Sequence, residues 1–288
     1  MNSTDKKDQE HWDLIITPKA RLLDIKFSEI WHYRDLLKMF VRRDYKAQYK
    51  QTVLGPLWYL IQPIFTSLIF ILIFGKIAKI PTDGIPSMLF YLSGICIWNY
   101  FDSCLTSTSS TFVQNANIFG KVYFPRLVLP LSTVFSNMIK FSIQFFLLIA
   151  VSAWVGFNTG QFYIGVNWLL IPLLVMMMAG LGLGLGIIVS SLTTKYRDFH
   201  LLLSFGVQLL LYTTPVAYPL SFLKDKPYAA WIAWNPLAPI VETFRFAFFN
   251  VGTLNLYGLL YSGVCIIVIL FIGVVMFNKV EKNFMDTV

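Results

Sequence analysis

The sequence predicts an all-α integral membrane protein with six transmembrane helices, preceded by an amphipathic helix in the membrane–water interface. Of its 288 residues, 56% are hydrophobic and only 13% are charged, whereas a soluble domain carries about 25% charged residues. The charges are also uneven, because residues 1–55 hold 11 Lys/Arg and 8 Asp/Glu. A polar head and an apolar body exclude a soluble enzyme, a disordered chain and a disulfide-stapled secreted domain.

The polar head divides into two parts. Residues 1–27 are a polar lead-in that lacks the apolar stretch of a cleavable signal peptide, so we expect a cytoplasmic N-terminus. Residues 28–51 show helical spacing of apolar residues, with Ser28 at the N-cap. Basic residues follow the apolar stripe: Arg34, Lys38, Arg42, Arg43, Lys46 and Lys50. We expect this helix to lie on phosphate headgroups, the alternative being a solvated helix packed on a partner.

Residues 52–288 form the expected transmembrane domain. The six expected spans are residues 57–74, 87–112, 128–154, 168–192, 201–216 and 257–277. The 18 residues of the first span rise about 27 Å, close to the hydrocarbon thickness. Residues 217–255 contain four prolines and pieces too short to span, so we expect re-entrant or interfacial helices on the outer side.

The distribution of positive charge predicts the orientation. With the N-terminus inside, the inner segments carry 17 Lys/Arg and the outer segments 5, while Lys140 lies within a span. Inner loops of membrane proteins carry the excess of Lys and Arg. We therefore expect both termini in the cytoplasm, and this bias explains the basic excess without nucleic acid.

Asp102 and Lys140 are the two ionisable residues deep within expected spans. Both are about 15 Å from the inner ends of their spans at 1.5 Å per residue, and isolated charges are expensive there. We predict that they pair or that both face a polar cavity. Three roles stay open: a structural ion pair, a direct part in transport, and a cavity that Asp102 faces alone.

No motif for catalysis, cofactor binding or metal binding is present. Neither Gly75-Lys76 nor Gly120-Lys121 has the surroundings of a phosphate-binding loop, and the three cysteines have no metal spacing. The alternating glycines of residues 180–186 lie in an apolar span, so they predict close packing against another helix.

The inner loop at residues 115–126 is amphipathic, aromatic and basic. We single out Asn117, Ile118, Phe119, Lys121, Tyr123, Phe124 and Arg126. A short connection needs none of these apolar side chains, and exposed ones indicate docking on a partner. The alternative is that the loop packs back onto the membrane surface.

Five stretches of the sequence together carry a resemblance to a known family. They are RDLLKMFVRRDYKAQYKQTVLGPLWYLIQP at 34–63, NANIFGKVYFPRLVLPLS at 115–132, SSLTTKYRDFHLLL at 190–203, TTPVAYPLS at 213–221 and WNPLAPIVETFRFAFF at 234–249. In this order they resemble the transmembrane subunits of ABC-2 type polysaccharide exporters, which export O-antigen, capsular polysaccharide or wall teichoic acid. With the terminal FNKVEKNFMD, the resemblance covers about residues 30–287.

The resemblance implies a mechanism and a set of partners. Two copies of this chain would pair with two copies of a separate ATPase, which binds ATP and Mg²⁺, in the bacterial inner membrane. A glycan on a lipid diphosphate would enter from the cytoplasmic leaflet. Residues 117–126 would be the coupling helix on the ATPase, residues 34–50 would also meet the lipid diphosphate, and residues 219–249 would close the outer gate.

The resemblance also indicates channel residues. Aromatic side chains at Phe70, Trp98, Phe101 and Tyr212 match positions where similar exporters place aromatics, and sugar rings stack on such side chains. The alternative is ordinary helix-packing or lipid-facing aromatics.

O-antigen is the expected cargo, with capsular polysaccharide or wall teichoic acid as the alternatives. A lipid or drug exporter of the same fold is more remote. A membrane glycosyltransferase would need convergent carboxylates, and Asp83, Asp102 and Asp198 are isolated.

Overall fold

The computed structural model describes residues 31–50, 52–115, 118, 124–161, 166–194, 196, 198–223, 226–227, 229–252 and 254–287. Within these ranges the chain forms helices and no strand, as the sequence predicts. The helices are α2 (Arg34–Tyr49), η1 (Gly55–Leu57), α3 (Trp58–Phe70), η2 (Ile71–Ile77), α4 (Ser87–Ser109), α5 (Thr111–Gln114), α7 (Val128–Thr159), η3 (Val166–Leu170), α8 (Ile171–Thr193), α9 (Phe199–Thr213), η4 (Leu220–Leu223), α10 (Ala229–Ala233), α11 (Leu237–Phe249) and α12 (Leu256–Thr287).

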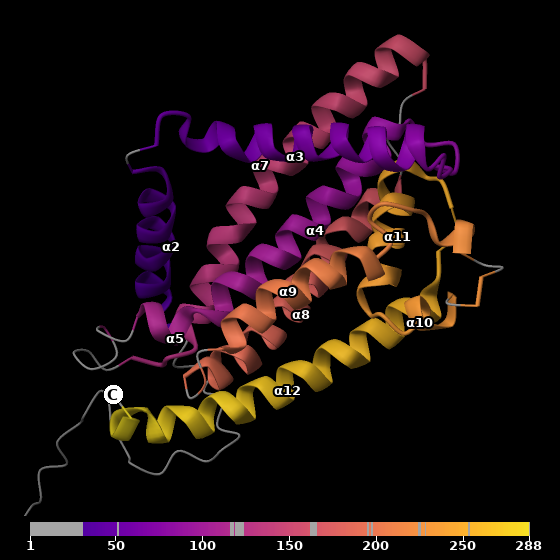
Figure 1. The fold of residues 1–288 in the computed structure, drawn as a ribbon. Helices are drawn as coiled ribbons and strands as arrows, with labels where there is room; N and C mark the ends of the chain where they lie inside the picture. Colours follow the sequence, from indigo (N-terminus) through magenta and orange to yellow (C-terminus); the bar gives the residue numbers. More distant parts are fainter. Residues whose placement is uncertain are drawn as a thin grey trace, which may run out of the picture.

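The long helices form a bundle with different elements at its two ends (Figure 1). At one end, called here the α2 end, α2 lies beside α5 at a steep angle to α3, and the end of α12 reaches the same place. At the opposite end, the α11 end, α11 packs against α4 and α8, and α10 lies beside it.

Four helical segments of the described chain are long and apolar enough to cross a membrane. They are Gly55–Ile77, Val128–Thr159, Asn167–Thr193 and Leu256–Lys279. Helix α4 is also 23 residues long, but Asn99, Asp102 and several serines and threonines lower its hydropathy. Helix α9 covers only 15 residues, about 22 Å. Helices thus occupy all six expected places, while the count of six spans stays a prediction.

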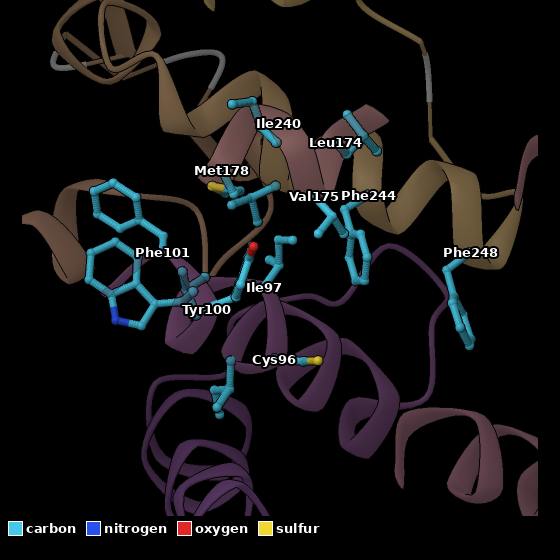
Figure 2. Close-up of a cluster of buried hydrophobic side chains, with 14 of the residues drawn as sticks. Cys96, Ile97, Tyr100, Phe101, Leu174, Val175, Met178, Ile240, Phe244 and Phe248 are labelled. Carbon is cyan, nitrogen blue, oxygen red and sulfur yellow. The ribbon is translucent and has the colours of Figure 1, made fainter. Parts of the chain in front are cut away.

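Helix α4 is the centre of the core. Sixteen of its residues are buried, between α8 on one side and α7 on the other. Figure 2 shows where Tyr100 and Phe101 of α4 meet Met178 of α8 and the side chains of Ile240 and Phe244 of α11. Helix α11 is therefore a packed part of the core, although its 13 residues are too few to span a membrane.

The alternating glycines of α8 allow two close helix contacts, which confirms the packing prediction. A Cβ on Gly182 would lie 2.7 Å from Cβ of Cys104, and one on Gly186 would lie 2.6 Å from Cβ of Thr108, both on α4. Gly180 and Gly184 face α12 instead, within 2.9 and 2.8 Å of isoleucine methyl groups. Positions four apart share a helix face, so the alternation gives α8 one small-residue face for each neighbour.

A second, smaller core closes the α2 end. Phe40 of α2 is buried against Phe124, with 5.9 Å between the ring centroids. Phe112 stacks on Phe277 of α12 beneath them. The helix predicted at 28–51 is present as α2, and Ser28 lies outside the described residues. Its apolar stripe covers this core, so α2 packs on its own bundle.

Candidate functional site

A polar seam runs between α4 and α7 through the apolar body. Three side-chain hydrogen bonds mark it: Thr108 Oγ1 to Thr133 Oγ1 at 3.2 Å, Asn137 Nδ2 to the Ser103 carbonyl at 2.9 Å, and Asn99 Nδ2 to Gln144 Oε1 at 3.4 Å. Residues three and four apart lie on one helix face, so each helix presents a row of polar groups. Polar groups in a membrane helix turn toward such partners because hydrocarbon offers none.

The seam opens at mid-bundle into a cavity of about 250 Å³, called here the central cavity. Helices α3, α4 and α7 line it with Tyr59, Gln62, Asn99, Tyr100, Asp102, Ser103, Asn137, Lys140, Phe141 and Gln144. Amides, hydroxyls, one carboxylate and one ammonium group therefore share a space between three largely apolar helices. Such a space must be filled by water or by a polar ligand.

Asp102 and Lys140 both line this cavity, as the equal depth of the two residues suggested. The expected ion pair between them is not formed: among the described residues, neither has an oppositely charged partner within 4 Å. The Lys140 ammonium instead lies 5.7 Å from the ring centroid of Tyr59, a cation–π distance. Two half-buried charges thus face the same polar space separately.

A second cavity of about 330 Å³, the end cavity, lies at the α2 end. Its lining includes Arg43, Asp44 and Gln48 of α2 and Asn115 after α5. Arg43 donates to Asp44 at 2.9 Å and to Asn115 Oδ1 at 3.1 Å, which ties α2 to the end of α5. Asn137 lines both cavities, so the end cavity and the central cavity lie on either side of one polar residue.

The basic residues of α2 face outward. All six of the predicted stripe are exposed: Arg34, Lys38, Arg42, Arg43, Lys46 and Lys50. Lys38 donates to Asp35 at 3.1 Å and thereby lowers the pKa of that exposed carboxyl. Arg43 also reaches the end cavity, while the other five basic residues lie away from the packed face of α2, as in an interface helix.

The predicted coupling segment is described only in part. Asn117, Phe119, Lys121 and Tyr123 lie outside the described residues. Ile118 is half-buried beside the end cavity, and Phe124 is only 5% exposed. The Phe124 ring therefore packs inward beneath α2, which corrects the expectation of an exposed docking side chain at this position. Arg126 is half-buried at the start of α7.

The four predicted channel aromatics lie in different environments. Trp98 and Phe101 are buried in the main core with their rings 5.5 Å apart, and Phe70 packs edge-on against Phe74 and Tyr91. Tyr212, in contrast, is 61% exposed on α9. None of the four side chains lines the central cavity or the end cavity, and their role in a channel stays a prediction.

At the α11 end, Arg245 is a buried clamp. Its guanidinium donates to the carbonyls of Pro215 and Val216 at 2.6 and 2.7 Å and lies 3.5 Å from the Glu242 carboxylate. It also lies 3.7 Å from the ring centroid of Phe90 on α4. Glu242 in turn accepts the backbone N–H of Leu220, so this pair fixes the proline-rich connection after α9.

Sequence reasoning missed the seam amides and the Arg245 clamp. Asn137, Lys140 and Gln144 recur at intervals of three and four within an apolar span, as Asn99 and Asp102 do on α4. That spacing was the available signal, because it places polar groups on one helix face. Arg245 left a weaker signal, since its ligands are carbonyls 29 and 30 residues away.

Known proteins resemble this chain along most of its length. The ABC-2 type transporter family model matches residues 35–249. An O-antigen export system permease protein RfbA of Klebsiella pneumoniae is 30% identical over 253 residues, which cover 88% of this chain and 94% of the relative. The RfbA of Myxococcus xanthus is 28% identical over 77% of this chain and 83% of its own length. The polysialic acid transport protein KpsM of Escherichia coli is 24% identical over 83% and 91%. Because the family model matches well over half of this helical membrane chain, the protein belongs to the ABC-2 type transporter family.

Proposed function

We propose that this chain is the permease subunit of an ATP-driven exporter that moves a lipid-linked polysaccharide, O-antigen in first place, across the bacterial inner membrane. The observation that carries the proposal is the similarity to O-antigen export permeases over 88% of this chain and 94% of the relative.

A separate ATPase is the expected partner, in two copies against two copies of this chain. Of the predicted coupling segment, Ile118 lines the end cavity and Arg126 lies just before α7, so these two residues lie at the α2 end, where an ATPase would dock. Phe124 contributes by holding the segment against α2, since its ring is buried beside Phe40. Force on the segment would therefore pass to α2 and α7 together.

The α2 end is the cytoplasmic side in this proposal. The exposed basic face of α2 supports it, because cytoplasmic segments carry the excess of Lys and Arg. At the α11 end, Trp154, Trp231 and Trp234 are exposed, as the aromatic residues of an outer interface are. Trp168, in contrast, stacks on Phe248 of α11.

A second copy of the chain would cover α3 and α9. Only 11% of the α3 span is buried, against 50% of the α8 span. The apolar side chains exposed on these two helices include Phe65, Leu68, Leu72, Leu202, Phe205 and Leu209. A glycan channel between two such faces would bring Tyr212 to its wall, while Trp98 and Phe101 would need the helices to separate.

Gentle purification from the native host tests the proposal. We expect mass spectrometry to find a phosphate-binding-loop ATPase at a one-to-one ratio, and deletion of this chain to remove the surface glycan. Absence of any ATPase, together with turnover of a lipid-linked sugar by the purified chain alone, would contradict export and favour a transferase.

The similarity to KpsM supports a second cargo, a capsular polysaccharide. The two cargoes are distinguished by the glycan that accumulates inside cells when the chain is deleted. A polymer on the O-antigen lipid carrier supports the first candidate, and a polymer with a capsular lipid end supports the second.

A further inference from the structure

The central cavity contains two charged side chains that a membrane-spanning helix bundle does not need for its stability. Among the described residues, the side chains of Asp102 and Lys140 form no hydrogen bond or ion pair within the chain, although both line a space at mid-bundle. Placing charges there is expensive. If the polar seam had only a structural role, we would expect its side chains to bond to both charges and to leave no cavity.

The cavity carries almost every kind of hydrogen-bonding group that a hydroxyl-rich ligand uses. The Asp102 carboxylate accepts, the Lys140 ammonium donates, and the amides of Asn99 and Gln144 do both. The Tyr59 and Phe141 rings add apolar walls against which C–H groups can pack. Its volume of about 250 Å³ equals the space of about eight waters, which suits a single sugar ring.

Net charge decides between a sugar and a phosphate. The carboxylate and the ammonium cancel, so the cavity offers no excess positive charge to an anion. A site for a phosphate would favour several donors without a carboxylate among them. One carboxylate that accepts hydrogen bonds and one ammonium group that donates them suit a neutral ligand with many hydroxyl groups.

The central cavity adjoins the end cavity. Asn137 lines both and stands between them, with its amide held by the Ser103 carbonyl at 2.9 Å. The end cavity lies beside α2, the helix that the family resemblance places against the lipid diphosphate.

From these observations we infer that the central cavity between α3, α4 and α7 is a binding site for one sugar ring of the exported glycan. The inference rests on the proposed function. It adds a subsite that is separate from the four predicted channel aromatics, since none of those residues lines the cavity.

The test uses the complex of this chain with its ATPase in lipid nanodiscs. The probe is free oligosaccharide released by mild acid from the surface glycan of the same host, followed by saturation-transfer NMR. The variant Asn99→Leu/Gln144→Leu replaces both partners of one hydrogen bond, so it leaves no amide unpaired. The control Ser142→Leu changes an exposed residue of α7 two positions from Gln144.

We expect sugar signals in the wild type and in Ser142→Leu, and an apparent affinity about tenfold weaker in the double variant. If the double variant binds the oligosaccharide with the same affinity as the wild type, the proposed sugar site is overturned. The absence of any sugar signal in a complex whose ATPase responds to the lipid-linked glycan overturns it as well, an outcome that leaves the proposed function intact. Failure of the proposed function shows separately, as surface glycan that persists after deletion of the chain.

A second variant separates a sugar from a phosphate headgroup. Asp102→Asn removes an acceptor for hydroxyls and also removes repulsion of an anion. Weaker binding of the oligosaccharide supports the sugar site. Tighter binding of inorganic phosphate, with no binding of the oligosaccharide in any form, overturns it in favour of a lipid phosphate.

Discussion

The two faces of α4 are built on opposite principles. The face toward α8 and α11 is closed: Gly182 and Gly186 bring backbones together. The Arg245 guanidinium packs there against two carbonyls, the Glu242 carboxylate and the Phe90 ring, while its Nε has no hydrogen-bond partner among the described residues. The face toward α3 and α7 is open, with two cavities and two charges that have no ion partner among the described residues.

The difference indicates a division of labour within one helix. Without a hydrophobic driving force in lipid, helices associate through close packing and hydrogen bonds, and the closed face supplies both. The open face is less tightly packed and has cavities lined by polar side chains. We therefore expect substitutions on the closed face to affect mainly stability, and substitutions on the open face to affect mainly binding and transport.

The largest effect is expected for Arg245→Met. The variant leaves the half-buried Glu242 carboxylate without its charged partner and leaves the buried carbonyls of Pro215 and Val216 without their donor. Breaking a buried ion pair in this way costs about 3–5 kcal/mol. The measurement is the free energy of unfolding in detergent by denaturant titration.

The double variant Arg245→Met/Glu242→Gln is the control, because it removes both charges and should recover part of the loss. A loss below about 1 kcal/mol for Arg245→Met would show that the closed face does not depend on this clamp.

A smaller loss is expected for Gly186→Ala. Its Cβ would lie 2.6 Å from Cβ of Thr108 and 3.0 Å from the Leu105 carbonyl oxygen, so the helices must move apart. Overpacking of this kind costs about 1–3 kcal/mol. Gly263→Ala on α12 is the matched control, since nothing lies within 4 Å of that Cβ position. Equal stability of the two variants would mean that the closed face is not tightly packed.

The closed face was largely predictable from the sequence. Glycines at every second position within an apolar span have few roles other than close helix packing. The positions and lengths of the apolar stretches predicted where the six helices lie. These inferences use short-range patterns, in which the period of a helix translates spacing directly into a face.

The candidate site was less predictable, because it depends on which helices become neighbours. Asp102 and Lys140 were found by their depth, and of the two predicted arrangements the structure has the shared polar cavity and not the ion pair, because the space between α3, α4 and α7 leaves room for both charges. Likewise, the aromatic character of Phe124 suggested docking, whereas α2 covers it. The spacing of residues along one helix does not predict that α3 is the third helix around the cavity or that α2 covers Phe124.

On the open face, Thr133→Val should have a modest effect on stability. The variant removes the hydrogen bond between Thr133 and Thr108 at 3.2 Å, beside the end cavity. Hydrogen bonds between membrane helices contribute about 0.6 kcal/mol on average, so the expected loss in the same unfolding experiment is of that size. A loss as large as that of Gly186→Ala would show that the seam holds α4 and α7 together as firmly as packing holds α4 and α8.

The smallest effect is expected for the coupling between Asp102 and Lys140. A double-mutant cycle with Asp102→Asn, Lys140→Met and the double variant measures it as the departure of the unfolding free energies from additivity. Because the two groups form no ion pair across the central cavity, their coupling should be about 0.5 kcal/mol, the low end of the range for residues that share a cavity. A coupling above about 1 kcal/mol would instead mean that the charges pair and the cavity closes around them. The open face would then be a second packed face, and the contrast between the two sides of α4 would disappear.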